Sequence, residues 1–405
     1  MKITRRAGLA GLAASTALMG LPRIGRAEEP EIVIGAPNSL TGGLAEGGKT
    51  FIDGISIAID KINREGGIKS LGGAKLRAVI ADTTSENAAQ AASVTRRIID
   101  LDKAVIVAGV TASAMTMAAQ IECEKSQIPL VTNSYADPIV LRGMKYTFKI
   151  LPQGGAIWNY GMDTVYEMFK ATKGAPPKNC IIVMSNDAVG LVVQKKLPEE
   201  AKKIGLEVVQ SFGYQMGLTD PSVAVAPVLQ LKPDVIFLGA FLNDLILIVN
   251  ALRSLGVTVP IVNGGVFNTE SVGNALGKNS EHLMGVCTGN WDLPVPGVSE
   301  LVEAYRKAHP DKSHYPPNEQ LEIGYSTGII IRDTLEKAAS REGPKLREVL
   351  ANTEFTGLPV PIEGGKVKYG PDGLNVYNNS ILAEWQDGKL RTIWPKRVQT
   401  VPPII

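Results

Sequence analysis

The sequence predicts an α/β protein with two doubly wound, Rossmann-like lobes, each built on a parallel sheet covered by helices. Short runs rich in β-branched residues alternate with helical patterns from Glu31 onward, as expected when helices connect parallel strands. Uninterrupted apolar runs, such as AVIVAG at 104–109, indicate strands buried on both faces. The pattern starts again near Asn179, and 405 residues are enough for two domains.

The first half supplies one such series of elements. Between 51 and 64 the isoleucines recur at helical spacing with polar residues on the opposite face, and Gly66-Gly67 ends this helix. The other elements follow in alternation. The expected strands are 32–36, 76–81, 104–108 and 129–132, and the expected helices are 51–64, 87–101 and 113–125.

The second half repeats the plan. VIVAG at 105–109 is followed by IPLVTN at 128–133, and VIFLGA at 235–240 is followed by VPIVNGG at 259–265 at nearly the same separation. The repeated strands are expected at 180–185, 206–212, 234–240 and 259–265, with helices at 197–204, 223–231 and 244–255. Segment 282–288 and a helix from 318 to 341 are expected to complete the first lobe. The tail predicts antiparallel strands at 366–370, 381–385 and 389–395.

An export signal is predicted at the N-terminus. Three basic residues among the first six precede an apolar stretch from Ala7 to Leu21, and Gly25-Arg26-Ala27 offers small residues for cleavage. Residues 1–27 are therefore expected to be a signal peptide, and the paired arginines also permit the twin-arginine route. The apolar stretch is shorter than the roughly 18 residues of a membrane anchor, so we expect a soluble periplasmic protein.

Charge and cysteine content exclude several classes of function. Removal of residues 1–27 takes five of 42 basic residues and none of 40 acidic ones, which changes the net charge from +2 to about −3. This balance does not favour nucleic acid or anionic lipid as a partner. The three cysteines lie far apart in apolar segments and are expected to be buried free thiols, with a single disulfide as the alternative: Cys123, Cys180 and Cys287.

A complete phosphate-loop motif stands at 43–50, where GLAEGGKT satisfies G-x-x-x-x-G-K-[ST]. In a nucleotide hydrolase the strand runs directly into this loop, but residues 37–42 intervene here. An exported chain also leaves the nucleotide pool behind. We therefore interpret the segment as the rim of a cleft, with a nucleotide hydrolase as a remote alternative.

A second motif, GYSTG at 324–328, fits the nucleophile elbow of serine hydrolases. That fold requires a histidine after the serine, but His282, His309 and His314 all precede Ser326. The segment is expected to lie inside a helix, where its small residues allow close packing. The two later histidines lack a third ligand nearby, so no zinc site is expected. No catalytic residue, metal or cofactor is predicted.

Ser113 has a position that suits an anion. It follows the buried strand at 104–108 and opens a helix, where free backbone amides attract negative charge. Its hydroxyl can donate to a carboxylate, or it can serve as an ordinary helix cap. The exit of the next strand, 133–137, would lie beside it, and ligands bind outside such strand ends.

Three segments together resemble the type I periplasmic binding proteins that serve branched-chain amino acid ABC transporters. They are IVIGAPNSLTGGLAEGG with the following FIDGISIAIDKINREGGI, GVTASAMTMAAQIECEKSQIPLVTNSYADP, and DVIFLGAFLNDLILIVNALRSLG. The resemblance covers essentially all of the mature chain. It implies two lobes joined by three crossovers, a hinge that closes over a small ligand, and delivery to a membrane permease. The implied lobes are 28–148 with 285–353, and 149–284 with 354–405.

The resemblance also implies a ligand site. Ser113 matches the serine that holds the ligand's carboxylate, and 134–136 match the backbone that assists it, although Ala136 replaces a threonine. The family's acidic partner for an ammonium falls at Gly265, and tyrosines of its cleft fall at Gly47, Val189 and Phe241. The candidate ligand-binding residues are Ser113, Ser134, Tyr135, Ala136, Leu44, Trp158, Asn186, Phe241, Gly265 and Phe267.

These observations predict a non-catalytic binding protein, expected to be monomeric, that captures a small carboxylate for an ABC permease in the inner membrane. A buried ammonium without a counter-ion would be unfavourable, so an amine-free acid with an apolar or aromatic body is favoured over an amino acid. For each aromatic residue near the site, ordinary core packing is the alternative role. The alternative function is a ligand sensor that feeds a membrane receptor.

Overall fold

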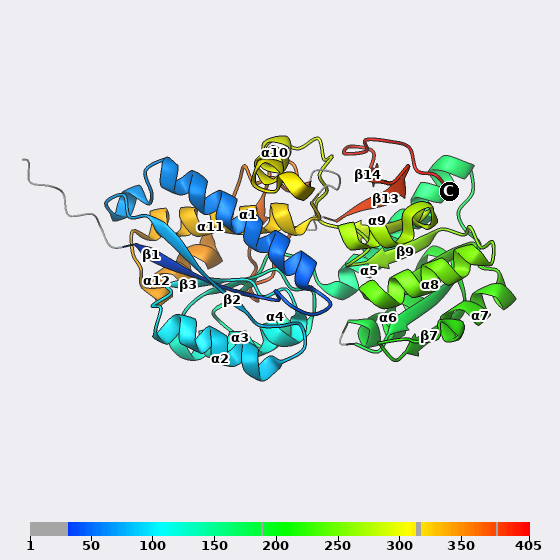
Figure 1. The fold of residues 1–405 in the computed structure, drawn as a ribbon, viewed down its shortest axis with the longest axis horizontal. Helices are drawn as coiled ribbons and strands as arrows, with labels where there is room; N and C mark the ends of the chain where they lie inside the picture. Colours follow the sequence, from blue (N-terminus) through cyan, green and yellow to red (C-terminus); the bar gives the residue numbers. More distant parts are fainter. Residues whose placement is uncertain (1–30, 188, 313–316, 378–379) are drawn as a thin grey trace, which may run out of the picture.

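Two α/β lobes lie side by side along the long axis of the molecule (Figure 1). The computed structural model describes residues 31–187, 189–312, 317–377 and 380–405. The predicted signal peptide, its twin-arginine pair and His314 lie outside these residues. The predicted fold class, two doubly wound lobes with parallel sheets, is confirmed.

The first lobe is built on a five-stranded parallel sheet with the order β2-β1-β3-β4-β5. Its strands are β1 (Ile32–Asn38), β2 (Leu76–Asp82), β3 (Ile106–Ala108), β4 (Leu130–Thr132) and β5 (Thr147–Lys149). Because all five are parallel, their carboxyl ends meet at one edge of the sheet. In Figure 1 this edge faces the second lobe.

Helices cover both faces of this sheet, with α1, α11 and α12 on one side and α2 and α3 on the other (Figure 1). Their bounds are α1 (Ala45–Arg64), α2 (Ala88–Asp100), α3 (Ser113–Ser126), α4 (Pro138–Leu141), α11 (Gln320–Ala338) and α12 (Gly343–Asn352). The isoleucine stripe of α1 packs with α11 in the main core of the lobe. Asn87 caps α2 by accepting from the Gln90 amide at 3.1 Å.

The second lobe contains a seven-stranded sheet with the order β14-β13-β10-β9-β8-β6-β7. The parallel strands are β6 (Asn179–Ser185), β7 (Glu207–Tyr214), β8 (Val235–Gly239), β9 (Ile261–Gly264) and β10 (Leu283–Cys287). A hairpin of β13 (Ile381–Gln386) and β14 (Lys389–Trp394) adds two antiparallel strands. Asp387-Gly388 turns this hairpin with positive φ at both residues, and the hairpin agrees with the antiparallel strands expected at 381–385 and 389–395.

Two helix layers enclose the second sheet in the same way. Helices α5 and α6 pack on one core cluster, and α7, α8 and α9 pack on the other. Their bounds are α5 (Gly154–Lys173), α6 (Gly190–Ile204), α7 (Ser222–Leu231), α8 (Leu242–Ser254) and α9 (Glu270–Leu276). Helix α10 (Val298–Ala308) bridges the lobes: Val302 enters the core of the second lobe, and Leu301 packs against Leu321 of α11.

Within the described ranges the chain crosses between the lobes three times. It passes from β5 to α5, from β10 through α10 to α11, and from the small pair β11 (Glu354–Phe355) and β12 (Val367–Lys368) to β13. This number agrees with the three crossovers that the family resemblance implies. Figure 1 shows α10 and the start of α5 between the two lobes.

The lobe boundaries expected from the sequence need two corrections. Segment 282–288 was expected to complete the first lobe, but β10 pairs between β9 and β13 in the second sheet. Residues 354–405 were expected in the second lobe, but Phe355, Val367 and Tyr369 lie in the main core of the first. A short antiparallel pair has apolar side chains that can pack on either sheet, so its sequence alone does not indicate the lobe.

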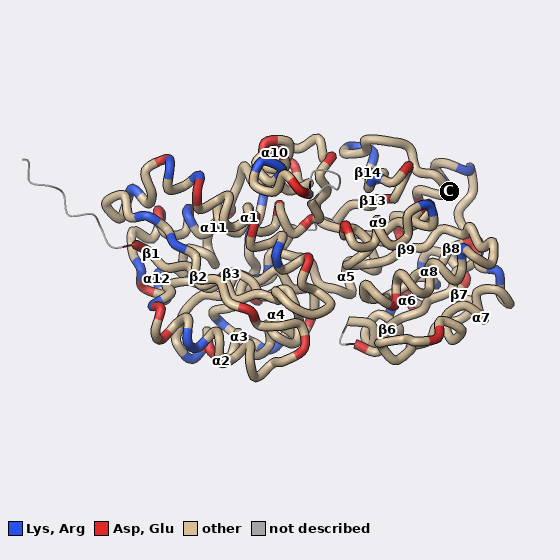
Figure 2. The backbone as a smooth tube through the Cα atoms, in the orientation of Figure 1, with Lys and Arg blue, Asp and Glu red and all other residues tan. Residues whose placement is uncertain are grey.

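The cysteines are unpaired, and charged residues of both signs are spread over the chain (Figure 2). All three cysteines are buried free thiols, as predicted, and burial raises the pKa of Cys180 to about 12. Figure 2 shows basic and acidic residues interspersed over both lobes. In the described part of the chain, the structure contains no helix that is both long and apolar enough to cross a membrane.

Candidate functional site

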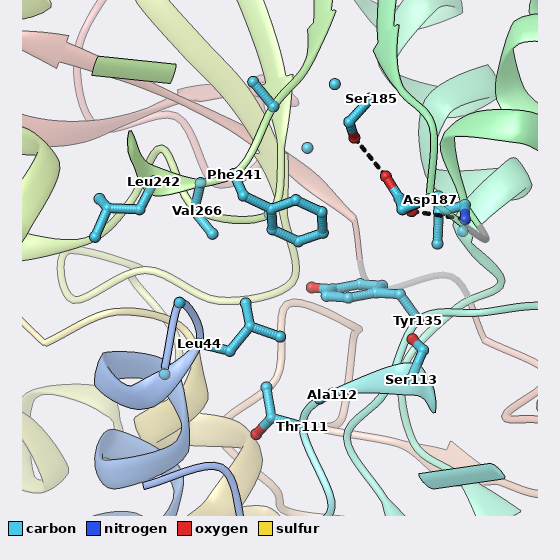
Figure 3. Close-up of a pocket in the computed structure, with 18 of the residues that line it drawn as sticks. Leu44, Thr111, Ala112, Ser113, Tyr135, Ser185, Asp187, Phe241, Leu242 and Val266 are labelled. Carbon is cyan, nitrogen blue, oxygen red and sulfur yellow. Dashed lines mark hydrogen bonds between the residues drawn. The ribbon is translucent and has the colours of Figure 1, made fainter. Parts of the chain in front are cut away.

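A cavity of about 300 Å³ lies between the lobes at the carboxyl ends of both sheets (Figure 3). Residues of the first lobe, the second lobe and the crossover before α11 contribute to its lining. The main contributors are Leu44, Thr111, Ser113, Tyr135, Trp158, Ser185, Asp187, Met216, Phe241, Leu242, Gly265, Val266, Asn268 and Glu319. The topology therefore brings side chains from distant parts of the sequence into one site.

Ser113 presents its hydroxyl at the first position of α3. Ala112 is the N-cap of that helix and makes no side-chain cap bond, so the alternative that Ser113 is an ordinary cap is wrong. The hydroxyl lies 2.8 Å from the Ser134 hydroxyl and accepts a 3.3 Å hydrogen bond from the Ala136 amide. Two hydroxyls and the amides of the first turn of α3 are thus concentrated at one end of the cavity.

A hydrogen-bond network holds the strand ends that carry these groups. The side-chain amide of Asn133 donates to the Thr111 hydroxyl at 2.8 Å and to the side-chain oxygen of Gln320 at 2.7 Å. The Asn38 side-chain oxygen accepts from the Thr111 backbone amide at 2.9 Å. The exits of β1, β3 and β4 are therefore tied to one another and to the start of α11.

The rest of the lining is largely apolar. In Figure 3 the rings of Tyr135 and Phe241 both extend into the cavity, from the first and the second lobe, and Leu44 points toward them. Trp158, on α5, is buried beneath the cavity floor, and its ring lies close to Gly264. An alanine at 264 would place its Cβ 3.0 Å from that ring, so the strand ends and the tryptophan are closely fitted.

Three acidic side chains also line the cavity, and each already accepts hydrogen bonds from the protein. Glu319 accepts from the Tyr135 hydroxyl at 2.7 Å, and from the Thr288 amide at 2.5 Å and hydroxyl at 3.0 Å. Burial raises the pKa of Glu319 above its usual value, although these hydrogen bonds oppose the shift. Glu319, which lies in the second crossover, thereby connects the cavity to the end of β10.

Asp187 belongs to the second lobe and lies just before α6. It accepts from the Val189 amide at 2.8 Å and the Gly190 amide at 3.2 Å, and from the Ser185 hydroxyl (Figure 3). Its carboxylate therefore compensates the free amides at this helix end.

Glu46 ties the two lobes together across the cavity. It belongs to α1 of the first lobe, but its carboxylate accepts from the Glu270 amide at 2.7 Å and from the Ser271 hydroxyl at 2.5 Å, both on α9 of the second lobe. Leu44, just before α1, packs against core clusters of both lobes. These contacts join the two lobes at the rim of the cavity.

Comparison with known proteins identifies the family. The family model described as periplasmic binding protein matches residues 31–389. The chain belongs to the periplasmic binding protein family. It is similar to solute-binding proteins that serve branched-chain amino acid ABC transporters. Such proteins act outside the cytoplasm, whereas the export route remains a prediction.

Relatives and solved structures agree with this assignment. The Leu/Ile/Val-binding protein homolog 8 of Brucella abortus is 25% identical over 379 residues, which covers 90% of this chain and 91% of the relative. The branched-chain amino acid transporter substrate-binding protein LivJ of Streptococcus pneumoniae, solved with isoleucine, has a TM-score of 0.78 at 23% identity, covering 90% and 100% of the two chains. A solute-binding protein from R. palustris, solved with benzoate, has a TM-score of 0.73 at 20% identity, covering 92% and 97%.

Most of the predicted site residues of this periplasmic binding protein lie at the cavity. Those that line it are Leu44, Ser113, Tyr135, Trp158, Phe241 and Gly265. Ser134 and Ala136 are fully buried behind the lining and contact Ser113. The aromatic residues differ in role, since Trp158 is a core side chain and Phe241 is half-buried at the cavity surface.

Two predicted site residues do not reach the cavity. Asn186 is exposed, and its side chain lies beside Gly213 of β7, because neighbouring residues at a strand end point in opposite directions. Phe267 is fully buried against Gly285, and its carbonyl accepts from the Trp385 ring nitrogen at 2.7 Å. Both placements correct the sequence prediction.

Sequence reasoning missed Asp187 and Glu319. Asp187 follows β6 by two residues, so the position of strand exits in a parallel sheet could have found it. Glu319 lies in the crossover more than 180 residues after Tyr135, and no local pattern indicates that the two meet.

The phosphate-loop motif of this binding protein does not form a phosphate loop. Helix α1 begins at Ala45, so Lys49 and Thr50 lie in its second turn instead of at its start. The Thr50 hydroxyl donates to the Glu46 carbonyl at 2.9 Å, and Lys49 is exposed. Gly43 and Gly47 line the cavity, which agrees with the interpretation of a cleft rim.

The GYSTG segment is a helix-packing surface, as predicted. A Cβ at Gly324 would lie 2.2 Å from the Phe51 carbonyl oxygen, and one at Gly328 would lie 2.5 Å from the Ala58 Cβ. Ser326 is fully buried inside α11, and its hydroxyl has no hydrogen-bond partner among the described residues. It is therefore not paired with any histidine in the described part of the chain.

The described histidines make structural contacts. His282 Nδ1 lies 3.1 Å from the Ile404 carbonyl oxygen, and His309 Nε2 lies 3.2 Å from an Asp53 carboxylate oxygen. The described residues contain no cluster of three or more His, Cys, Asp or Glu side chains that could hold a metal ion.

Replacing Glu322 by glutamine is expected to stabilise the protein at alkaline pH. Glu322 is buried in the first turn of α11, and both its carboxylate oxygens lack hydrogen-bond partners among the described residues. Burial raises its pKa to about 8 from a usual 4.5. Between these two pH values the folded state binds the extra proton, so wild-type stability falls as pH rises. The variant lacks this loss, so its free energy of unfolding should exceed that of the wild type by a few kcal/mol near pH 8.

Melting temperatures of both proteins from pH 5 to 9 test this expectation. The difference in melting temperature between the wild type and Glu322→Gln should increase with pH. The exposed control Glu199→Gln should melt at the wild-type temperature throughout. Parallel curves for the wild type and Glu322→Gln would contradict the raised pKa of Glu322.

Proposed function

We propose that this protein captures a small carboxylate with an apolar or aromatic body and no amine, and presents the closed form to an ABC permease in the inner membrane. The observation that carries the proposal is the Ser113 hydroxyl, which faces the cavity at the first position of α3 without serving as its cap. We expect the protein to act as a monomer.

The end of the cavity at α3 supports a carboxylate. The helix has 14 residues, and the amides of its first turn lack intrahelical partners. These amides and the positive end of the helix dipole favour an anion. The Ser113 hydroxyl, already 2.8 Å from Ser134, can turn its proton toward a carboxylate oxygen.

The opposite side of the cavity supports the absence of an amine. Gly265, where the family's acidic residue was expected, lines the cavity and carries no side chain. The carboxylates of Glu46, Asp187 and Glu319 are each engaged by at least two protein donors. An ammonium needs several acceptors when it leaves water, and its burial without them is unfavourable.

The composition of the remaining wall supports an apolar body. Tyr135, Phe241, Leu242 and Val266 line the space beyond Ser113, and the volume of about 300 Å³ suits a small organic acid. The benzoate in the R. palustris structure and the isoleucine in LivJ represent the two ligand classes to be compared.

Matched pairs of acids with and without an amine decide between these classes. Residues 28–405 are purified, stripped of bound solute by unfolding and refolding, and melted with leucine or isocaproate, with phenylalanine or hydrocinnamate, and with benzoate. We expect melting shifts for the amine-free members, worth about 2.7 kcal/mol at 100 times Kd. Shifts for leucine or phenylalanine alone would restore an amino acid as the ligand, and no shift with any acid would overturn the carboxylate proposal.

A further inference from the structure

Lys149 is a fully buried lysine that lies directly behind the anion end of the cavity. It is the last residue of β5, at the first crossover, and its side chain is 0% exposed. Its backbone is held on both sides, since its amide donates to the Gly373 carbonyl at 2.8 Å and its carbonyl accepts from the Asn375 amide at 2.9 Å. The ammonium nitrogen donates to the Tyr135 carbonyl at 2.7 Å.

That carbonyl belongs to the same peptide group as the amide that contacts Ser113. The Tyr135 oxygen accepts from Lys149, while the Ala136 nitrogen donates to the Ser113 hydroxyl at 3.3 Å. In a trans peptide the oxygen and the hydrogen point in opposite directions, so Lys149 and Ser113 lie on opposite sides of one planar group. A positive charge on the oxygen side polarises the group and strengthens its N–H as a donor.

Among the described residues, no lysine or arginine side chain lines the cavity. Three acids are among the residues that line it. A carboxylate placed at Ser113 would therefore contact hydroxyls and amides directly. The hydrogen bonds around Ser113 lead, through the Tyr135–Ala136 peptide, to the positive charge on Lys149.

We propose that Lys149 determines the preference of this site for an anion, by supplying through the Tyr135–Ala136 peptide the positive charge that the cavity lining lacks. The inference rests on the proposed capture of a carboxylate and extends it to the residue that makes the site selective for charge. Lys149 is a positioning residue, because it acts on the ligand through the peptide and does not touch it.

A consequence of this arrangement is proton uptake on binding. Burial lowers the pKa of Lys149 to about 7, and the carboxylates of Asp137, before α4, and Asp372, in the turn after β12, act in the opposite direction. An anion at Ser113 acts in the same direction as these carboxylates and raises the pKa of Lys149. Near neutral pH, part of the protein therefore takes up a proton when the anion binds. Affinity is then full below pH 7 and falls by up to about tenfold per pH unit above it, until the pKa of the bound state is reached.

Calorimetric titration with isocaproate and with hydrocinnamate tests the inference. Heats measured at pH 7.5 in phosphate and in Tris, which differ in ionisation enthalpy, report the number of protons taken up. The wild type should take up a substantial fraction of a proton. Lys149→Arg should bind within a few-fold of the wild type but take up none, because arginine stays charged. Lys149→Met should bind about tenfold more weakly or worse and also take up none.

Lys145→Met is the matched control, because it removes the same charge from an exposed position in the same segment and should leave both affinity and proton uptake unchanged. Wild-type binding without proton uptake, or unchanged affinity in Lys149→Met, would overturn the role of Lys149 while leaving carboxylate capture intact. If neither acid binds the wild type, carboxylate capture itself fails and the inference fails with it. Should Lys149→Met not fold, the loss of proton uptake in Lys149→Arg still decides.

Discussion

Replacing Gly54 by alanine is expected to destabilise the first lobe by several kcal/mol, although it adds a single methyl group. Helices α1 and α11 approach so closely that a Cβ at Gly54 would lie 2.3 Å from the Leu321 carbonyl oxygen and 2.7 Å from the Tyr325 amide nitrogen. Both contacts are with backbone, which cannot turn away as a side chain can. The two helices must therefore move apart.

Such a separation affects more than one contact. Both helices contribute to the main core of the lobe, through Phe51 and Ile55 on α1 and through Ile330 and Leu335 on α11. Gly324 makes the reciprocal approach, since a Cβ there would lie 2.2 Å from the Phe51 carbonyl oxygen. Interiors packed at crystal-like density transmit such strain instead of absorbing it.

The four tryptophans allow the effect to be assigned to one lobe. Trp158, Trp291, Trp385 and Trp394 all pack with core clusters of the second lobe. In urea, the circular dichroism of Gly54→Ala should show a transition at lower denaturant, while tryptophan fluorescence should change much less.

Gly47→Ala is the matched control on the same helix. Its Cβ would meet only the flexible Gln320 side chain at 3.6 Å, and alanine is the better helix former, so stability should be unchanged or slightly higher. Equal stability of Gly54→Ala and Gly47→Ala would contradict the close backbone packing.

Replacing Ser113 by alanine is expected to weaken binding of the preferred acid by about ten- to hundredfold. A hydrogen bond to a charged group contributes ~1.5–3 kcal/mol, and 1.4 kcal/mol corresponds to a factor of ten. Stability should change little, because the hydroxyl does not cap α3 and alanine is favourable at the first position of a helix.

Titration calorimetry of Ser113→Ala with the acid that gives the largest melting shift measures this loss. Ser126→Ala makes the same change at the exposed far end of α3 and should bind as the wild type does. Undiminished affinity in Ser113→Ala would place the carboxylate elsewhere in the cavity. Loss of folding would appear in the melting curve without ligand and would be distinguished from loss of binding in this way.

The elements that the sequence predicted well are those whose pattern is long and local. The helix at 113–125 was placed within one residue of α3, and the strand at 76–81 within one residue of β2. The helix at 51–64 was started too late, because the glycines of the phosphate-loop motif lower helix propensity and hide the first turns of α1. The hydrogen bonds from α9 of the second lobe to Glu46 stabilise those turns in the folded protein.

Strand β5 and helix α5, at the first crossover between the lobes, are among the elements that the sequence did not predict. Strand β5 has only three residues, and α5 mixes glycines, aromatics and small residues without a narrow apolar stripe. Because α5 packs both on its own sheet and beneath the cavity, its pattern reflects two environments at once. Periodicity alone does not resolve such a helix.

By itself the sequence determined the two-lobed α/β fold and the family resemblance, and it indicated Ser113 at the start of α3 as a candidate position for an anion, because each depends on patterns within a few turns of chain. Only the tertiary structure decided that Asp187, Glu319 and Lys149 surround the site, that Asn186 and Phe267 do not, and that 354–375 belong with the first lobe. The reason is physical: the direction of a side chain at a strand exit and the partner it meets are set by packing between segments far apart in sequence, which no local pattern records.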